Sequence, residues 1–217
     1  MIPFVDSHTH QPIVTSDIIQ VVNCYAEDDI NNPYCSVGIH PWYINKDRID
    51  EQYRLLEEKA LLKNVIAIGE CGLDKLKGEE LAFQQKVFEY QIDLSERIKK
   101  PLLIHQVRQL NEILSMHKHL KPIQPWVLHG FKGNIHQTRQ ALKQNLWLSF
   151  SPSILNQDGF EEIIAICDKK PFLIETDNSG ISIYEYYLKV ADRLNMPIEE
   201  LKKRVFAHFS LLLNSNT

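Results

Sequence analysis

Several features are missing from this 217-residue sequence, and each absence removes a class of protein. No apolar run approaches the roughly 20 residues that a membrane-spanning helix needs. The net charge is -4, so there is no basic surface of the kind that grips long nucleic acid. Nucleic acid is still a possible substrate, because bound divalent cations can supply local positive charge. No charged leader precedes the first apolar run, and we expect no signal peptide.

The cysteines are few, scattered and without C-x-x-C spacing. They are Cys24, Cys35, Cys71 and Cys167. Most of them stand inside apolar runs, so we expect buried, reduced thiols and a cytoplasmic protein. The sequence also has no internal repeat, low-complexity segment or linker, and a chain of this length usually forms one domain. We therefore expect a single domain over residues 1–217.

Short apolar runs alternate with helical patterns along most of the chain. Eight runs are strand-like, at residues 4–8, 19–25, 34–40, 65–71, 101–105, 126–131, 146–151 and 172–177. Helical patterns cover residues 49–63, 81–100, 110–120, 135–144, 159–169, 183–195 and 198–213. Near-continuous apolar strands separated by helices are typical of a parallel sheet with both faces covered.

Eight such strands predict an α/β fold of the (β/α)8 TIM-barrel class. The chain is short for this fold, for which about 250 residues is typical. The missing length lies in the first two crossovers, because residues 11–17 and 27–32 are too few for full helices. We expect a compact barrel with these two crossovers shortened and with an extra C-terminal helix over residues 198–213.

Residues that can bind metal ions stand at the carboxyl ends of the predicted strands, where the active site of a parallel barrel lies. The first run ends in His8 and continues to His10. In an extended chain residues i and i+2 project to the same side, so these two imidazoles can converge on one ion. A single His-x-His is weak evidence, but later strands end in the same kind of residue. The full set is His8, His10, Glu70, His105, His129 and Asp177.

A ring of imidazoles and carboxylates suits borderline divalent metals such as Zn²⁺ or Mn²⁺, with Mg²⁺ as a further possibility. Six ligands are too many for one catalytic ion that keeps a position open for water. Two ions that share Glu70 fit the set better. A water between two cations ionises near neutral pH and can attack a phosphoryl or carbonyl centre. Asp177 is our candidate to bind metal and to take the proton of that water.

At these residues the chain resembles the TatD family of metal-dependent hydrolases. The matching motifs are Asp6-x-His8-x-His10, Gly38-Ile39-His40-Pro41, Ile68-Gly69-Glu70-x-Gly72-Leu73-Asp74, Pro101-x-x-x-His105, His129-x-Phe131-x-Gly133 and Glu175-Thr176-Asp177. They follow the family's order from residue 6 to residue 177. The resemblance implies a TIM-like barrel, divalent metals and hydrolysis of phosphodiester bonds in DNA. By the family's pattern one metal would take His8, His10, Glu70 and Asp177, and the other Glu70, His105 and His129.

The sequence departs from the family's pattern in places that put substrate contacts in doubt rather than the metal ligands. The final Asp is usually followed by a small residue and Pro, whereas this chain has Asn178-Ser179. The last helix reads His208-Phe209-Ser210-Leu211-Leu212 where the family often ends in Leu-Phe or Ile-Phe.

Six further residues are candidates for the site. His40, Arg108 and Lys132 follow strand ends and could contact substrate, Arg108 by a bidentate bond to phosphate. Trp42, two residues after His40, offers a face for stacking. Arg108 and Lys132 could equally be solvated loop charges, and His40 could be local packing beside Pro41. Asp6 and Glu175 could support the ligands from behind, Asp6 by a hydrogen bond to a ligand histidine.

The sequence thus predicts a metal-dependent hydrolase that cuts ester bonds through a metal-bound hydroxide at a dinuclear centre. We expect a deoxyribonuclease acting on single-stranded DNA ends, with no membrane and no obligate protein partner. One alternative keeps the metals and cuts a small nucleotide-derived or aminoacyl ester or amide. The weakly acidic net charge and short loops favour that alternative. The other alternative is a metal-binding module without catalysis, but it would not explain why six ligands converge.

Overall fold

A computed structural model describes residues 2–167 and 170–214 of the chain. The fold class is the predicted (β/α)8 barrel, with parallel strands followed by helices. Two compact units are present, and we describe them separately. Unit 1 combines the chain up to Val21 with His129–Asn214, and unit 2 is Val22–Leu128. The single domain over residues 1–217 stays a prediction.

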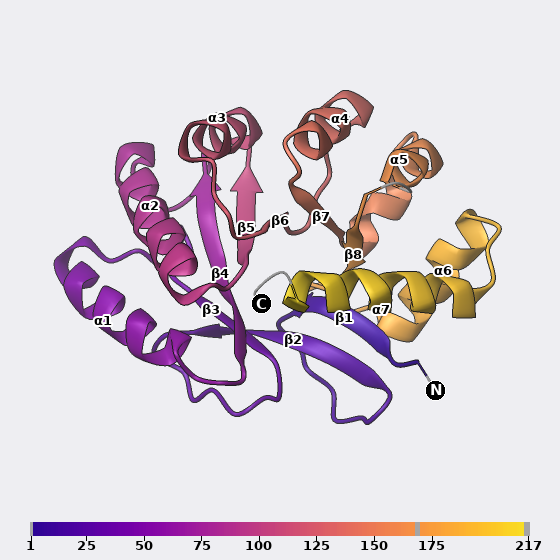
Figure 1. Ribbon diagram of the computed structural model, residues 1–217, viewed down its shortest axis with the longest axis horizontal. Helices are drawn as coiled ribbons and strands as arrows, with labels where there is room; N and C mark the ends of the chain where they lie inside the picture. Colours follow the sequence, from indigo (N-terminus) through magenta and orange to yellow (C-terminus); the bar gives the residue numbers. More distant parts are fainter. Residues whose placement is uncertain (1, 168–169, 215–217) are drawn as a thin grey trace. The chain divides into compact units, whose positions relative to one another are not determined.

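Unit 2 holds consecutive parallel strands with the helices between them. The strands are β2 (Ile18–Tyr25, which begins in unit 1), β3 (Cys35–Gly38), β4 (Val65–Asp74), β5 (Leu102–Val107) and β6 (Trp126–Leu128). The helices are the short 3-10 turn η1 (Lys46–Arg48), α1 (Ile49–Ala60), α2 (Leu81–Ile98) and α3 (Leu110–Leu120). Each strand pairs in parallel with the next, with a register shift in the β3–β4 ladder and another in the β4–β5 ladder. Helices α2 and α3 pack on β4 and β5 (Figure 1).

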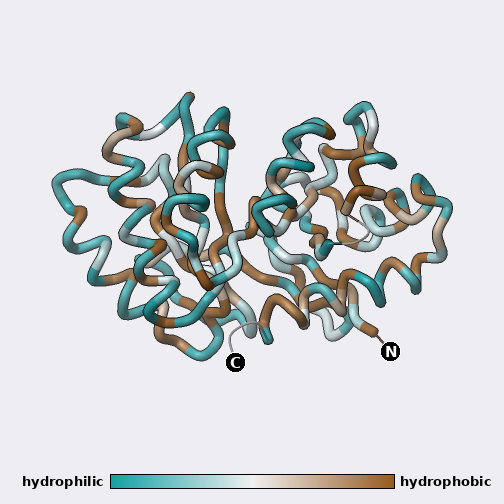
Figure 2. Tube along the Cα trace, turned by 45° about the horizontal axis from the view of Figure 1, so that its top comes forward, coloured by the Kyte–Doolittle hydropathy of each residue, from teal (hydrophilic) through white to brown (hydrophobic). Residues whose placement is uncertain are grey.

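The core of unit 2 follows from the apolar stripe of α2. Val87, Phe88 and Ile92 lie on its buried face against β4. Figure 2 shows the same pattern in colour, since the helical coils alternate between teal and brown while the strand segments are largely brown. The helix ends where Lys99 adopts a left-handed conformation, with φ 56°, and donates its N–H to Ser95 O. The Lys99-Lys100-Pro101 stop signal explains this end, because proline cannot continue the helical hydrogen bonds.

Unit 1 holds the remaining strands, four α-helices and one short 3-10 helix among its described residues. The strands are β1 (Phe4–Thr9), β7 (Trp147–Phe150) and β8 (Phe172–Ile174). The helices are α4 (Ile135–Lys143), the 3-10 helix η2 (Pro152–Asn156), α5 (Phe160–Cys167), α6 (Ile183–Arg193) and α7 (Ile198–Asn214). β7 pairs with β8 in parallel, a parallel bridge joins Thr9 to Asp177 beyond β8, and α7 packs on β1 and β8 (Figure 1).

The predicted elements are present, but several of their ends differ. No helix lies in the first two crossovers of the described chain, and α7 is the expected extra helix. β4 extends to Asp74, beyond the predicted end at Cys71, because its ladder with β5 continues to Asp74↔Val107. β8 ends earlier, at Ile174, and the chain turns at Asp177, where φ is 53°. The sequence did not predict the helices η1 and η2. The last residues of the predicted helix 159–169 lie outside the described residues.

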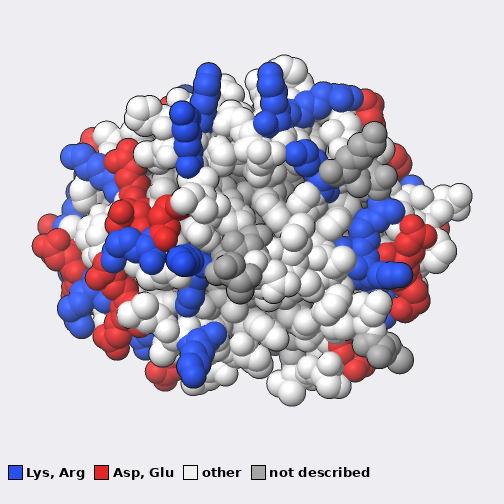
Figure 3. All heavy atoms as spheres, in the orientation of Figure 1, with Lys and Arg blue, Asp and Glu red and all other residues white. Residues whose placement is uncertain are grey.

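Charged side chains of both signs are interspersed over α1 and α2. Arg97 illustrates the pattern, since it pairs with Asp93 on its own helix at 2.8 Å and with Glu57 of α1 at 2.7 Å. Figure 3 shows this mixture of red and blue on the left of the view. Such exposed pairs contribute little to stability, typically below about 1 kcal/mol each. Among the described residues, no helix is both long and apolar enough to cross a membrane.

Strand β1, which carries His8, is tied to α6 by one buried hydroxyl. Tyr187 is fully buried, donates its hydroxyl to Val5 O at 3.0 Å and accepts from Val5 N at 3.3 Å. Its ring also packs edge-on against Phe4, at 5.1 Å between centroids. Tyr184 packs on Phe4 in the same way, at 4.8 Å, from one turn earlier in the helix.

We expect Tyr187→Phe to lower the free energy of unfolding by about 1–3 kcal/mol, because it leaves two buried backbone groups of Val5 unsatisfied. Urea denaturation followed by circular dichroism measures this change. Tyr184→Phe is the matched control, since it removes a hydroxyl from the same helix and keeps the ring on Phe4. Equal stability of the two variants would contradict the role given to the Tyr187 hydroxyl.

Candidate metal centre

In unit 2 three predicted site residues meet at the carboxyl ends of β3, β4 and β5. Glu70 is buried, with only 5% of its surface exposed to solvent. Its Oε1 lies 3.4 Å from His40 Nε2 and 3.5 Å from His105 Nδ1. One donor atom of each of these residues lies within 4.8 Å of the others, so the group can hold a metal ion.

The position of Glu70 depends on close packing behind it. Its backbone N–H donates to Asn23 Oδ1 of β2 at 3.0 Å. A Cβ on Gly38 would lie 2.5 Å from the Glu70 carbonyl oxygen, so only glycine lets β3 approach so closely. The glycine before Ile39-His40 is therefore needed for the site rather than for a turn.

A buried carboxylate orients His105. Asp74 is 2% exposed, and its Oδ2 lies 3.1 Å from His105 Nε2. Burial raises the pKa of Asp74, but hydrogen bonds from His105 and Trp42 outweigh it and lower the pKa below its usual value. Because an ionised carboxylate only accepts, His105 donates Nε2–H and its Nδ1 lone pair faces Glu70. His105 Nδ1 and the Glu70 carboxylate are then both acceptors, and they stay close only with a proton or a cation between them. A carboxylate that accepts the other N–H of a ligand histidine is common in metal sites.

His40 has a different hydrogen-bond pattern, although it reaches the same carboxylate. The backbone N–H of Trp42 donates to His40 Nδ1 at 3.1 Å. In the neutral ring this leaves the proton on Nε2, the atom that faces Glu70. His40 therefore has the form of a hydrogen-bond donor rather than of a ligand, in keeping with its predicted contact with substrate.

In unit 1 a second group forms where β1 ends beside the chain that leaves β8. His8 Nε2 and His10 Nε2 lie 3.8 and 3.7 Å from Asp177 Oδ1. His8 is fully buried, while the side chains of His10 and Asp177 are 26% and 35% exposed. Backbone bonds fix this meeting, since Asp177 N donates to His8 O at 2.9 Å and His10 N to Asp177 O at 3.3 Å. These three side chains also have donor atoms close enough to hold one ion.

His129 is oriented by Glu175, much as His105 is by Asp74. Its Nδ1 lies 3.3 Å from Glu175 Oε1, which also accepts from Gly130 N at 2.6 Å. The other carboxylate oxygen accepts from Ser149. Burial raises the pKa of Glu175, but the hydrogen bond and the charge of His129 outweigh it and lower the pKa overall. In the neutral ring His129 donates through Nδ1, and its Nε2 is then the atom that can bind metal.

Asp6 supports the other side of this group through the residue before Asp177. Its Oδ1 accepts from Thr176 N at 2.8 Å and its Oδ2 from the Thr176 hydroxyl at 2.6 Å. The predicted hydrogen bond from Asp6 to the ring of a ligand histidine stays a prediction, while the backbone of His8 does donate a hydrogen bond to Asp6. Burial raises the pKa of Asp6 to about 7, because it outweighs the hydrogen bonds from Thr176, which lower the pKa.

The two basic candidates lie at the surface of their units. Arg108 follows β5 in a left-handed conformation, φ 56°, and its side chain is exposed. Lys132 is exposed three residues after His129. Neither has a described contact with the site residues, and their roles in substrate binding stay predictions.

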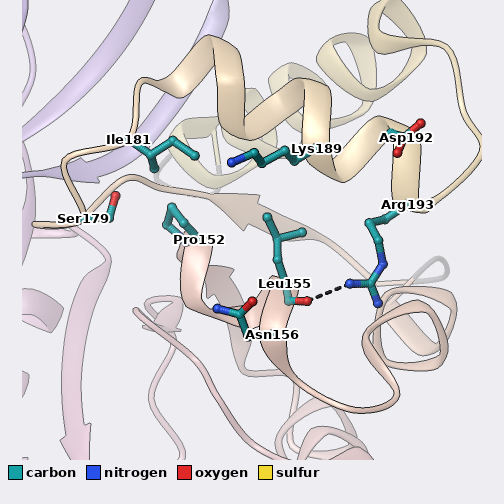
Figure 4. Close-up of a pocket in the computed structure, with 8 residues that line it drawn as sticks. All are labelled: Pro152, Leu155, Asn156, Ser179, Ile181, Lys189, Asp192 and Arg193. Carbon is teal, nitrogen blue, oxygen red and sulfur yellow. Dashed lines mark hydrogen bonds between the residues drawn. The ribbon is translucent and has the colours of Figure 1, made fainter.

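Two hollows of unit 1 lie near this region. A small one, of about 210 Å³, is lined by Asp6, Thr176 and Asp177 among others, so it reaches the predicted ligand. A larger one, of about 460 Å³, lies between η2 and α6 (Figure 4). Its cations are already paired, Arg193 with Glu161 and Lys189 with Glu185. None of the predicted site residues lines it, and we assign it no role.

The sequence missed the groups that hold the site residues in place. These are Asn23, Asp74 as the partner of His105, and Ser149. Asn23 and Ser149 are polar residues inside apolar runs, and that pattern is the signal that could have indicated them, because a buried polar group needs a partner. Asp74 gave no such signal, because it follows the predicted strand 65–71.

Comparison with known proteins identifies the family of this chain. The family model described as TatD related DNase matches residues 10–213. A protein of Buchnera aphidicola named as an uncharacterized metal-dependent hydrolase is 30% identical over 200 residues, which are 84% of this chain and 75% of that protein. The 3'-5' ssDNA/RNA exonuclease TatD of Citrobacter rodentium is 25% identical over 178 residues, 76% of this chain and 65% of that one.

A solved structure shows the same fold. The crystal structure of YjjV, a TatD homologue from Escherichia coli K12, aligns with a TM-score of 0.81 at 21% identity and covers 97% of this chain and 98% of that chain. With the family model matching nearly the full length, this chain belongs to the TatD-related DNase family of metal-dependent hydrolases.

Proposed function

We propose that this chain is a divalent-metal-dependent deoxyribonuclease that removes nucleotides from single-stranded DNA ends. The observation that carries the proposal is the state of the histidines. His105 and His129 each give one ring N–H to a buried carboxylate and turn the other nitrogen toward further ligands. This arrangement serves cation binding rather than packing, because each carboxylate holds its imidazole in the ligand form.

The donor sets fit two divalent ions. His8, His10 and Asp177 supply two imidazoles and a carboxylate in unit 1, where His129 is a further candidate. Glu70 and His105 supply a carboxylate and an imidazole in unit 2. The role of Glu70 as a ligand shared by both ions stays a prediction, as do the number and identity of the ions.

Bound divalent cations would supply a Lewis acid that lowers the pKa of water and stabilises negative charge on phosphate. The side chains do the remaining work. Asp177 is partly exposed, so its carboxylate can take a proton from water. His40, with its proton on Nε2, can donate a hydrogen bond to a phosphoryl oxygen. Asp74 and Glu175 stay ionised and keep the imidazoles oriented.

A named relative supports the proposed DNA substrate, and the free cysteines support the proposed cytoplasmic location. The Citrobacter relative is named for exonuclease action on single-stranded DNA and RNA, and we extend the DNA activity to this chain. We place the protein in the cytoplasm, since its four cysteines are free thiols and buried.

The alternative substrate is a small nucleotide-derived or aminoacyl ester or amide, cut by the same centre. The net charge of -4 favours it over long DNA. A metal-binding module without catalysis has the least support, because relatives of this chain are named as a metal-dependent hydrolase and an exonuclease.

Metal removal and Glu70→Gln should each abolish shortening of end-labelled single-stranded DNA. We expect activity to return with Mg²⁺, Mn²⁺ or Zn²⁺ in the wild type. In Glu70→Gln we expect it to fall at least about 100-fold, because the variant loses a carboxylate predicted to hold the cations that stabilise transition-state charge. Glu58→Gln, an exposed change on α1, is the control. If the protein binds metal but does not cleave DNA, the DNA substrate is contradicted and the small ester or amide becomes the proposed substrate.

Asp74→Asn should weaken metal binding by about 10- to 100-fold while the fold is kept, because it removes the carboxylate that orients His105. Isothermal titration of the metal-stripped protein measures the affinity. Asp93→Asn, an exposed neutralisation on α2, should leave it unchanged. An Asp74→Asn protein with wild-type metal affinity would show that the orientation of His105 does not depend on Asp74.

Salt separates the two substrate classes. If DNA is bound through its phosphates, KM for single-stranded DNA should rise steeply with salt concentration, since counterions compete for each contact. KM for a small neutral ester or amide should change little. Steady-state kinetics over a salt series measures both, and a flat profile with DNA would contradict phosphate-based recognition.

A further inference from the structure

Trp42 stands exposed beside the predicted site histidines of unit 2. It is 37% exposed, whereas the other two tryptophans, Trp126 and Trp147, are 1% and 8% exposed. Its ring centroid lies 4.9 Å from that of His40 and 5.5 Å from that of His105. An indole that the core does not bury is available to a ligand at this position.

The indole is held in a fixed orientation. Its Nε1–H donates to Asp74 Oδ2 at 2.6 Å, and the same oxygen lies 3.1 Å from His105 Nε2. Asp74 therefore sets the position of the indole and of the imidazole together. A flat group stacked on Trp42 would have a defined position relative to His105.

A lysine covers the ring of Trp42. Lys77 Nζ lies 3.7 Å from the ring centroid, a close cation–π contact. The backbone N–H of Lys77 donates to Asp74 Oδ1 at 3.1 Å, so the loop is fixed while the side chain is exposed. Lys75 is also exposed on this loop. An aromatic face beside mobile cations is how proteins hold single-stranded nucleic acid without reading its sequence.

We propose that Trp42 and Lys77 form the subsite for the terminal nucleotide of a single strand. The base stacks on the indole face that Lys77 covers, and the ammonium moves to the backbone phosphate. Base stacking on an aromatic ring is the stronger contact of the two, because the ammonium over an exposed ring is still largely hydrated. This inference rests on the proposed nuclease function and names how its substrate is held.

The subsite selects single strands over duplexes. A base can stack on Trp42 only when it has left the stack and pair of its own duplex, which costs free energy at a blunt end. It also tolerates any base, because every base presents a flat π face.

The test measures binding of a short oligothymidylate with phosphorothioate linkages, which slow hydrolysis, to the full chain in Mg²⁺ buffer. Emission of Trp42 should be quenched to saturation, since the two buried tryptophans do not meet the base. Anisotropy of the labelled oligonucleotide gives affinity independently. Trp42→Leu should weaken binding by about tenfold, within the range measured for loss of one base stack, and Trp42→Phe should restore part of it.

Lysine variants test the phosphate contact. Lys77→Met should weaken binding and reduce the slope of affinity against salt by about one counterion, because it removes one phosphate partner. Lys63→Met is the matched control. Lys63 is an exposed lysine of the same unit that lies just before β4, whereas Lys77 lies just after β4. It should bind like the wild type.

The inference is overturned if Trp42→Leu binds the single strand as tightly as the wild type, or if a blunt duplex binds equally well. Saturation by thymidine monophosphate at comparable affinity would also overturn it, since the site would then be one for mononucleotides. Unchanged binding in Trp42→Leu together with metal-dependent cleavage leaves the nuclease proposal standing. Quenching and tight binding without any cleavage would instead defeat the nuclease proposal and keep the subsite.

Discussion

Two of the four predicted ligand histidines, His105 and His129, depend on a buried carboxylate that fixes which ring nitrogen carries the proton. Asp74 does this for His105 and Glu175 for His129. A neutral imidazole has one donor and one acceptor nitrogen, so the choice of partner decides whether the ring can bind a cation. His40 shows the opposite choice, because a backbone N–H occupies its acceptor nitrogen.

Keeping a carboxylate ionised in the interior is costly, and the packing around each one reflects that cost. Burial of Glu175 raises its pKa, but hydrogen bonds from His129 and Ser149 and the charges of nearby histidines outweigh burial and lower the pKa. The backbone N–H of Gly130 is a third donor to the same carboxylate. Ser149 in turn bonds to Ser7 at 2.8 Å, which links β7 to β1. The polar core of unit 1 and the strand that carries His8 are thus parts of one hydrogen-bonded network.

The alternation of apolar runs with helical patterns was enough to predict the fold class, and the rule of strand carboxyl ends was enough to gather the site candidates. The register of β4 against β5 was not predictable, so the strand was expected to end at Cys71 although it continues to Asp74 opposite Val107. Hydrogen-bond partners such as Ser149 and Asn23 also escaped. A single polar residue in an apolar strand does not say which distant strand supplies its partner, since that depends on register and twist.

The three donors to Glu175 limit which residues can replace one another at their positions. Position 130 must supply a backbone N–H at φ 54°, which excludes proline and favours glycine. Position 149 must supply a small hydroxyl at the same carboxylate. Replacing either partner alone leaves a buried charge undersatisfied, so positions 130, 149 and 175 are under joint rather than separate selection. Among related chains, substitutions at these three positions should therefore occur together, and a descendant that loses the glutamate should also be free to lose the serine.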